Sequence, residues 1–393
     1  MTSFFNYLIL PLLISSVTGQ QLISLSNLKG GNVQNFLKNE DDCSLYVSAS
    51  SDDDAILAAI QVVSGNNQIS LRDMKYRRFP EHSGILQPYQ IQPNSYITTG
   101  LATEKLANLG GVLYYNTAAQ LQNLLFYVVT VDSAQPIDVT TFGAVNTTVV
   151  FLNTNTAAVP NLSTKITNWS QDKDATASIY QGIPQDGLEP INTQIFSNPM
   201  HSDGFVGHFE NVEPFSLSSV AFYLKTFKGC SFNIEPGTVS LDGTTTTAFT
   251  TTGFYMKPLG DVDASIRIKT LKDVKSLGLI GANILGSAPA GGEVSFLVND
   301  GAKVLGSETT IPADFFAPWS TQNVASDIVI SSKGTKMGRY FVQYCVVQGP
   351  GPFSTVTPTT TKHVETTTKL SATHSMILMI LFSMISCATL MTH

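Results

Sequence analysis

The chain is 393 residues long, only 13% of its residues are charged, and its formal net charge is −7 at pH 7. Because soluble domains usually carry about 25% charged residues, hydroxyl, amide and sugar groups must keep this surface in solution. The acidic balance excludes a nucleic-acid-binding protein, since neutralising a phosphate backbone requires a basic face.

The first 19 residues predict a secretory signal peptide. An apolar core at residues 4–17 is followed by the small residues Thr18 and Gly19, which favours cleavage after Gly19. The rest of the chain is then expected in an oxidising, extracellular compartment.

Residues 22–132 are predicted to form a first β-sandwich module. Apolar and polar side chains alternate at residues 22–28, and the apolar block at residues 55–63 is interpreted as a buried strand. Residues 64–67 predict the turn of a hairpin. The closing run at residues 124–131 is rich in β-branched and aromatic side chains, which favours a strand covered on both faces.

A basic cluster lies inside this module, with four cations and one tyrosine within residues 72–78. Such a cluster can contact a sugar or an anionic headgroup, but an exposed strand and loop without a ligand would have the same composition. We predict that the ligand-binding side chains are Tyr76, Arg77, Arg78 and His82.

Residues 133–225 are predicted to form a second, glycosylated β module. The three Asn-x-Ser/Thr triplets of the chain lie here, within 25 residues of each other. In a secreted chain each triplet is a signal for glycan attachment, so this part of the chain is expected to face solvent. The predicted acceptors are Asn146, Asn161 and Asn168.

A histidine-rich stretch at residues 201–210 is the best candidate for metal chemistry. Residues two apart share a strand face, so His201 with Asp203 and His208 with Glu210 could converge across a glycine-rich turn. Two imidazoles and two carboxylates would suit a metal ion. The spacing matches no zinc motif, and a solvated hairpin would contain the same residues.

Residues 226–348 are predicted to form the last β-sandwich module. Of the four cysteines, Cys387 lies in the C-terminal tail, which leaves Cys43, Cys230 and Cys345. In an oxidising compartment three cysteines predict one disulfide and one remaining thiol. We favour a Cys230–Cys345 disulfide, because these two residues open and close the same module.

Aromatic pairs recur in three strand-like runs, at residues 126–127, 222–223 and 340–341. They indicate either the general composition of a β protein or three modules that end on equivalent strands. The predicted fold is therefore all-β, with two or three β-sandwich modules followed by a Thr/Pro-rich stalk.

The stalk is predicted at residues 349–373, where proline, glycine and threonine prevent core formation. Residues 374–393 follow, with 16 uncharged, mainly apolar residues from 376 to 391. That run is short for a span of about 20 residues and lacks a basic flank, which favours a GPI-attachment signal. A secreted protein or a single-pass membrane protein is the alternative.

Two stretches carry a family resemblance. Residues 42–47 and 229–237 are each similar to the cysteine-containing strand near the start of a CUB domain, and each runs on to an aromatic closing strand. The chain resembles the divergent CUB-like proteins of nematode secretions. The resemblance covers the first and last modules and implies β-sandwiches of CUB-like or jelly-roll type. It also implies extracellular recognition and no catalysis.

The predicted function is recognition of a carbohydrate or protein ligand at the cell surface, in defence for example, and not an enzymatic reaction. No cofactor is expected, because the glycine-rich run at residues 278–286 lacks the spacing and flanking elements of a dinucleotide loop. A passive surface coat is the first alternative. A metal-dependent hydrolase that uses His201 and His208 is the second.

Overall fold

The structure is a computed structural model. It divides the chain into the units Met1–Ser354 and Thr355–His393. The predicted signal peptide, nearly all of the stalk and the apolar tail lie outside the residues that it describes. Those residues are 21–37, 43–80, 84–116, 125–140, 145–154, 162–184, 194–202, 205–238, 242–247, 250–257, 263, 265–270, 278–287, 292–300, 303–310, 319–334, 339–347 and 353–355.

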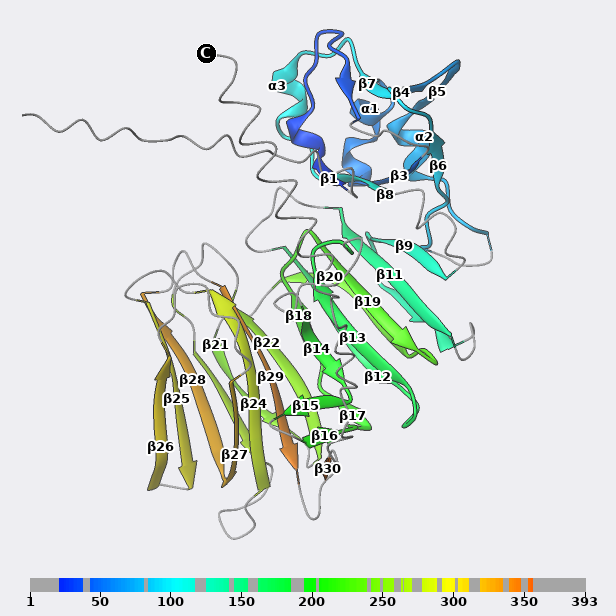
Figure 1. Cartoon of the computed structure of the whole chain (residues 1–393). Helices are drawn as coiled ribbons and strands as arrows, with labels where there is room; N and C mark the ends of the chain where they lie inside the picture. Colours follow the sequence, from blue (N-terminus) through cyan, green and yellow to red (C-terminus); the bar gives the residue numbers. More distant parts are fainter. Residues whose placement is uncertain are drawn as a thin grey trace, which may run out of the picture. The chain divides into compact units, whose positions relative to one another are not determined.

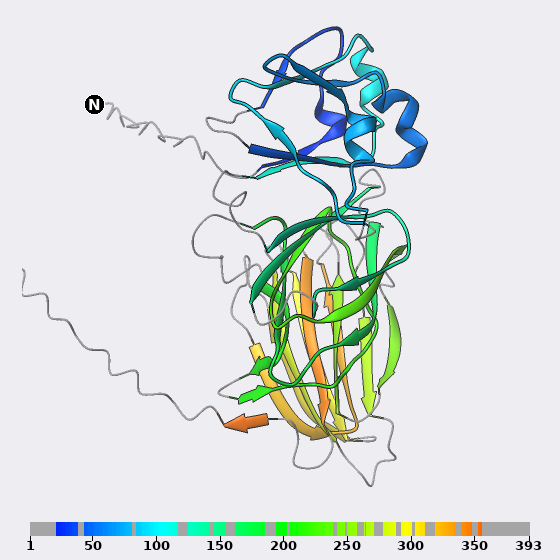
Figure 2. The ribbon, with the colours of Figure 1, turned by 90° about the vertical axis from the view of Figure 1, so that its right-hand side faces the viewer.

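The all-β prediction is confirmed, because the described residues form thirty strands and five short helices. In this part of the chain no helix combines the length and apolar character needed to cross a membrane. The helices gather with the blue and cyan N-terminal strands in Figure 2. They are η1 (Leu25–Asn27), η2 (Ser51–Asp53), α1 (Asp54–Leu57), α2 (Leu71–Lys75) and α3 (Thr103–Leu106).

Two four-stranded antiparallel sheets form the N-terminal region (Figure 1). Sheet A has the order β1-β8-β3-β6 and sheet B the order β2-β7-β4-β5. Leu45 and Leu113 of sheet A share a buried cluster with Val62 and Ile97 of sheet B. The strands are β1 (Gln21–Ser24), β2 (Asn35–Phe36), β3 (Cys43–Ser48), β4 (Gln61–Ser64), β5 (Asn67–Ser70), β6 (Tyr89–Ile91), β7 (Tyr96–Thr98) and β8 (Val112–Asn116).

The apolar block at residues 55–63 is divided between α1 and β4, so its interpretation as one strand is wrong. The short helix η2, which the Ser50 side chain caps by accepting from the backbone N of Asp52, leads directly into α1. Acidic residues fill the first turns of both helices, where they are favourable. The hairpin after this block is confirmed: Ser64 pairs with Asn67, and Gly65 has a φ of 57° at the turn.

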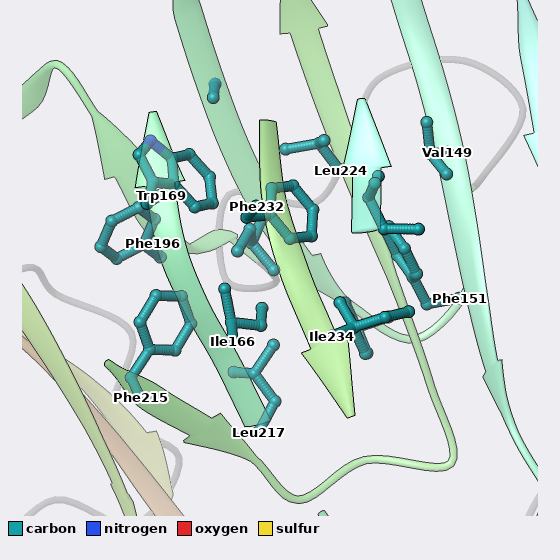
Figure 3. Close-up of a cluster of buried hydrophobic side chains, with 14 of the residues drawn as sticks. Val149, Phe151, Ile166, Trp169, Phe196, Phe215, Leu217, Leu224, Phe232 and Ile234 are labelled. Atoms are coloured by element: carbon teal, nitrogen blue, oxygen red, sulfur yellow. The ribbon is translucent and has the colours of Figure 1, made fainter. Parts of the chain in front are cut away.

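Two further sheets form the central sandwich. Sheet C has the order β14-β13-β19-β11-β9 and sheet D the order β10-β20-β12-β18. Their facing side chains include Phe151, Trp169 and Phe232, which lie together in Figure 3. The strands are β9 (Phe126–Val131), β10 (Gln135–Asp138), β11 (Asn146–Asn153), β12 (Leu162–Ser170), β13 (Thr176–Gln181), β14 (Gln194–Asn198), β18 (Phe215–Leu217), β19 (Ala221–Phe227) and β20 (Ser231–Thr238).

The C-terminal sandwich has two five-stranded sheets. Sheet E has the order β17-β22-β29-β24-β27 and sheet F the order β21-β23-β28-β25-β26. Val342 of β29 packs with Phe296 and Ile328 of sheet F. The strands are β17 (Asn211–Val212), β21 (Asp242–Thr247), β22 (Thr251–Lys257), β23 (Ser265–Thr270), β24 (Gly278–Ser287), β25 (Glu293–Asp300), β26 (Lys303–Thr310), β27 (Trp319–Ala325), β28 (Asp327–Lys333) and β29 (Arg339–Val347).

Sheet A is covered on both faces. The side chains of Tyr46 and Tyr114 point away from sheet B and pack with Val150 and Tyr223 of sheet C. Beside them, the Ser48 hydroxyl lies 2.6 Å from the Thr130 hydroxyl of β9 and donates to the carbonyl O of Leu152 at 3.0 Å. This double coverage explains why all six residues of β3 are buried.

Strand pairing crosses the predicted module boundaries at residues 132 and 225. β9, expected to close the first module, pairs in parallel with β11 of sheet C. β20, expected to open the last module, pairs with β12 of sheet D. Both strands therefore contribute to the central sandwich, where Val129 of β9 and Phe232 of β20 share one buried cluster.

Candidate functional site

The predicted basic cluster lies on α2 and the turn after it, here called the α2 corner (residues 70–80). Ser70 caps the helix, its hydroxyl oxygen accepting a hydrogen bond from the backbone N of Asp73 at 3.0 Å. Arg72, Tyr76 and Phe79 are exposed on this corner, with 51% of Tyr76 accessible.

Lys75 and Tyr76 of the α2 corner already have a hydrogen-bond partner within the fold. Lys75 is buried, and its Nζ donates to Oδ1 of Asp54 at 2.7 Å, while the Tyr76 hydroxyl donates to Oδ2 at 2.5 Å. These hydrogen bonds, together with the charge of Lys75, hold the pKa of Asp54 below its usual range. Lys75 therefore has a structural partner that an anionic ligand would have to displace.

The two predicted arginines also have partners inside the fold. Arg78 forms a salt bridge with Asp132, the residue after β9. The Arg77 guanidinium lies 5.8 Å from the ring centroid of Tyr89 on β6. Both side chains are half buried, and His82 lies outside the described residues. The structure thus brings Tyr76, Arg77 and Arg78 together, but of these three it leaves Tyr76 the most exposed.

The histidine-rich stretch forms the predicted hairpin. β15 (Met200–Ser202) pairs with β16 (Phe205–Gly207), with His201 opposite Val206. His201 is exposed, whereas both ring nitrogens of His208 are buried. Burial lowers the pKa of His208, and the nearby carboxylate of Glu210 partly offsets this.

The metal-site hypothesis for these residues stays a prediction. Asp203, one of its four ligands, lies outside the described residues. Among the residues that are described, no three His, Cys, Asp or Glu side chains form a group that could hold a metal ion.

The predicted Cys230–Cys345 disulfide is not formed in the structure. Cys230 is buried as a thiol in the core of the central sandwich, next to the start of β20. Cys345 lies within β29, where it packs with Met200 and Phe209 in a separate cluster. Because Cys230 belongs with the central sandwich and not with the last module, the two sulfur atoms do not meet. Burial raises the pKa of the Cys230 thiol.

Two of the predicted glycan acceptors lie at one end of the central sandwich. Asn146 begins β11 opposite Phe227, the last residue of β19. Asn168 is exposed at a β-bulge near the end of β12, with a φ of 54°, and Ser170 beside it pairs with Ser231, the first residue of β20. Since β20 follows β19 after three residues, both acceptors flank the same turn. Asn161 lies outside the described residues.

A second exposed surface lies on the outer face of sheet B. Phe36 pairs with Tyr96, Tyr96 with Val63, and Val63 with Gln68, so one row crosses all four strands. This row, Phe36, Tyr96, Val63 and Gln68, is here called the aromatic platform. Phe36 is 59% exposed, and its ring centroid lies 5.6 Å from that of Tyr96. Sequence reasoning missed the platform, because its four residues come from separate short strands without clear alternation.

Two solved structures show a distant likeness to the chain. One is a protein in the atomic structure of Sulfolobus Turreted Icosahedral Virus, with 11% identity, coverage of 85% of this chain and 91% of that chain, and a TM-score of 0.18. Another is an insecticidal delta-endotoxin of Bacillus thuringiensis, with 9% identity, coverage of 83% and 54%, and a TM-score of 0.18. Neither score indicates a shared fold.

A family model described as "Transmembrane glycoprotein" matches residues 40–385 of the chain. No curated protein matches, and these comparisons give no support to the CUB-like resemblance. Because the family match extends from before β3 into the apolar C-terminal tail, it covers most of the sequence and nearly all of the described fold. The chain therefore belongs to this family of transmembrane glycoproteins.

Proposed function

We propose that the protein is a membrane-attached glycoprotein of the cell surface that binds an extracellular ligand and does not catalyse a reaction. The observation that carries this proposal is the family match over residues 40–385, which joins the folded β-sheets to the apolar tail. The sequence patterns of a signal peptide and glycan acceptors agree with it.

The surroundings of the chemically reactive side chains support a binding role. Lys75, Arg78 and Asp132 are committed to ion pairs within the fold, and His201 and His208 differ in their exposure. The exposed aromatic side chains Phe36, Tyr76 and Phe79 instead suit recognition, since rigid aromatic side chains supply contact area at a small cost in entropy.

Recognition is tested with the full-length protein reconstituted in fluorescent liposomes. Its binding to cells that carry extracellular ligands is expected to saturate and to be competed by liposomes with unlabelled protein, while protein-free liposomes do not bind. Binding that rises linearly with concentration and resists competition would favour a passive coat.

The mode of membrane attachment is tested on cells that express the full chain. Release by phosphatidylinositol-specific phospholipase C is the result expected for the GPI anchor that we propose. A protein that the phospholipase leaves in place and that detergent extracts would instead be held by a transmembrane span.

A further inference from the structure

We propose, on the basis of the recognition function above, that the aromatic platform of sheet B binds an uncharged oligosaccharide. The platform lies on the face of the sheet opposite to Val62 and Ile97, which point into the core. Its row crosses four strands at a spacing of about 4.8 Å, so it extends over roughly 14 Å. A short oligosaccharide can lie along a row of that length.

The two rings supply the apolar part of such a site. Phe36 and Tyr96 are tilted by 55° to one another, so a sugar ring stacked on one of them meets the side of the other. Aliphatic C–H groups of a sugar gain dispersion energy and lose water on contact with an aromatic face. Phe36, which lies on the edge strand β2, is the more exposed of the two rings.

The polar groups around the rings match sugar hydroxyls. Gln68 ends the platform row and is exposed, and the next row on the same face contains the half-buried Thr98 and Gln61. Amide and hydroxyl groups both donate and accept hydrogen bonds, as sugar hydroxyls do. None of the residues in these two rows is charged, which favours a neutral ligand over a sialylated or sulfated one.

A second copy of the chain fits this surface less well. Two aromatic side chains offer about 150–250 Å² each even when fully exposed, whereas a stable protein interface buries about 800 Å² on each partner. The flanking amides would also have to be paired across the interface. A small polar ligand with an apolar face is therefore the better match to this surface.

The test uses cells that display the full chain and fluorescent polymers carrying neutral, sialylated or sulfated oligosaccharides. Neutral polymers are expected to bind. Phe36→Leu keeps an apolar side chain but removes the ring, so it should weaken binding roughly five- to tenfold, and Phe36→Tyr should retain binding. Val304→Ala is the matched control, because Val304 is a similarly exposed apolar residue, at 53%, on β26 outside the platform.

Three results would overturn the proposal. They are a preference for charged polymers, equal binding by Phe36→Leu and the unaltered protein, and no binding of neutral polymers by protein that still binds cells. If the unaltered protein binds cells but not neutral polymers, the recognition function stands and only the sugar proposal fails. If the unaltered protein shows no saturable binding to cells, the recognition function fails as well. If the unaltered protein binds no sugar but self-associates, and Phe36→Leu abolishes that self-association, the occupant of the platform is a second copy of the chain. If Phe36→Leu fails to reach the surface, Gln68→Ala tests the polar end of the same row.

Discussion

The central sandwich and the outer face of sheet B use aromatic side chains in opposite ways. In the sandwich, Trp169 stacks on Phe232 with ring centroids 5.1 Å apart and an interplanar angle of 7°, and both side chains are buried (Figure 3). On sheet B, Phe36 and the half-buried Tyr96 form a tilted pair on the face that meets solvent. The sandwich pair has a second sheet to pack on, so residue type alone does not separate a core aromatic from a binding aromatic.

The largest expected effect on the free energy of unfolding comes from Trp169 in the buried pair. Trp169→Ala removes a large side chain from between Phe196 and Phe232, and we expect it to lower the free energy of unfolding by about 3–5 kcal/mol. Phe36→Ala, on the exposed face, is expected to change it by less than ~0.5 kcal/mol. Denaturant unfolding of the purified variants measures both values. Equal losses would mean that the platform is part of the stabilising core.

The same comparison applies to two glutamines. Gln343 of β29 is buried, and its amide accepts from the backbone N of Ser197 at 3.0 Å and donates to the carbonyl O of Ser197 at 2.7 Å. It thereby joins sheet E to the edge strand β14 of sheet C. Gln343→Leu leaves both backbone groups without this partner, so we expect a loss of about 2–3 kcal/mol. Gln68→Leu, at an exposed position, should lower the free energy of unfolding by less than ~0.5 kcal/mol. If Gln343→Leu leaves the free energy of unfolding unchanged, water replaces the amide.

Two ion pairs extend the comparison to charged groups. Arg78 and Asp132 have side-chain exposures of 28% and 24%, whereas Lys165 and Glu235 have 48% and 40%. Because solvent screens the second pair more, double-mutant cycles should give a coupling energy of about 1 kcal/mol for Arg78 with Asp132 and less than ~0.5 kcal/mol for Lys165 with Glu235. A coupling near zero for the first pair would mean that this salt bridge does not help to hold the α2 corner against the end of β9.

Sequence reasoning predicted the local features of this molecule better than the distant ones. Strand content and the turn at Gly65 follow from alternation and turn chemistry, and the hairpin around His201 was expected from its glycines. The helix α1 was missed because the acidic residues that begin η2 and α1 precede an apolar run that also suits a strand.

The differences between expectation and structure over longer distances have one common cause. The pairing of β9 with β11 and of β20 with β12 depends on which apolar faces meet in space, and no periodicity within a segment encodes that choice. The disulfide prediction failed because it assumed the wrong partner sheet for Cys230. The role of Arg78 was missed because its partner, Asp132, lies 54 residues away in sequence.

The smallest effect on stability is expected from His208, the residue that follows β16. Burial lowers the folded-state pKa of His208 below the unfolded value of about 6.5. As the pH falls through the unfolded value, the unfolded chain takes up a proton before the folded chain does, so the free energy of unfolding decreases until the folded pKa is also passed. His208→Gln removes the difference between the folded and unfolded pKa values at this position. The free energy of unfolding of the variant should therefore fall less between pH 7 and pH 5 than that of the unaltered protein. Denaturant unfolding at both pH values measures the change, with His201→Gln as the exposed control. If both variants follow the pH dependence of the unaltered protein, the burial of the His208 ring does not destabilise its protonated form.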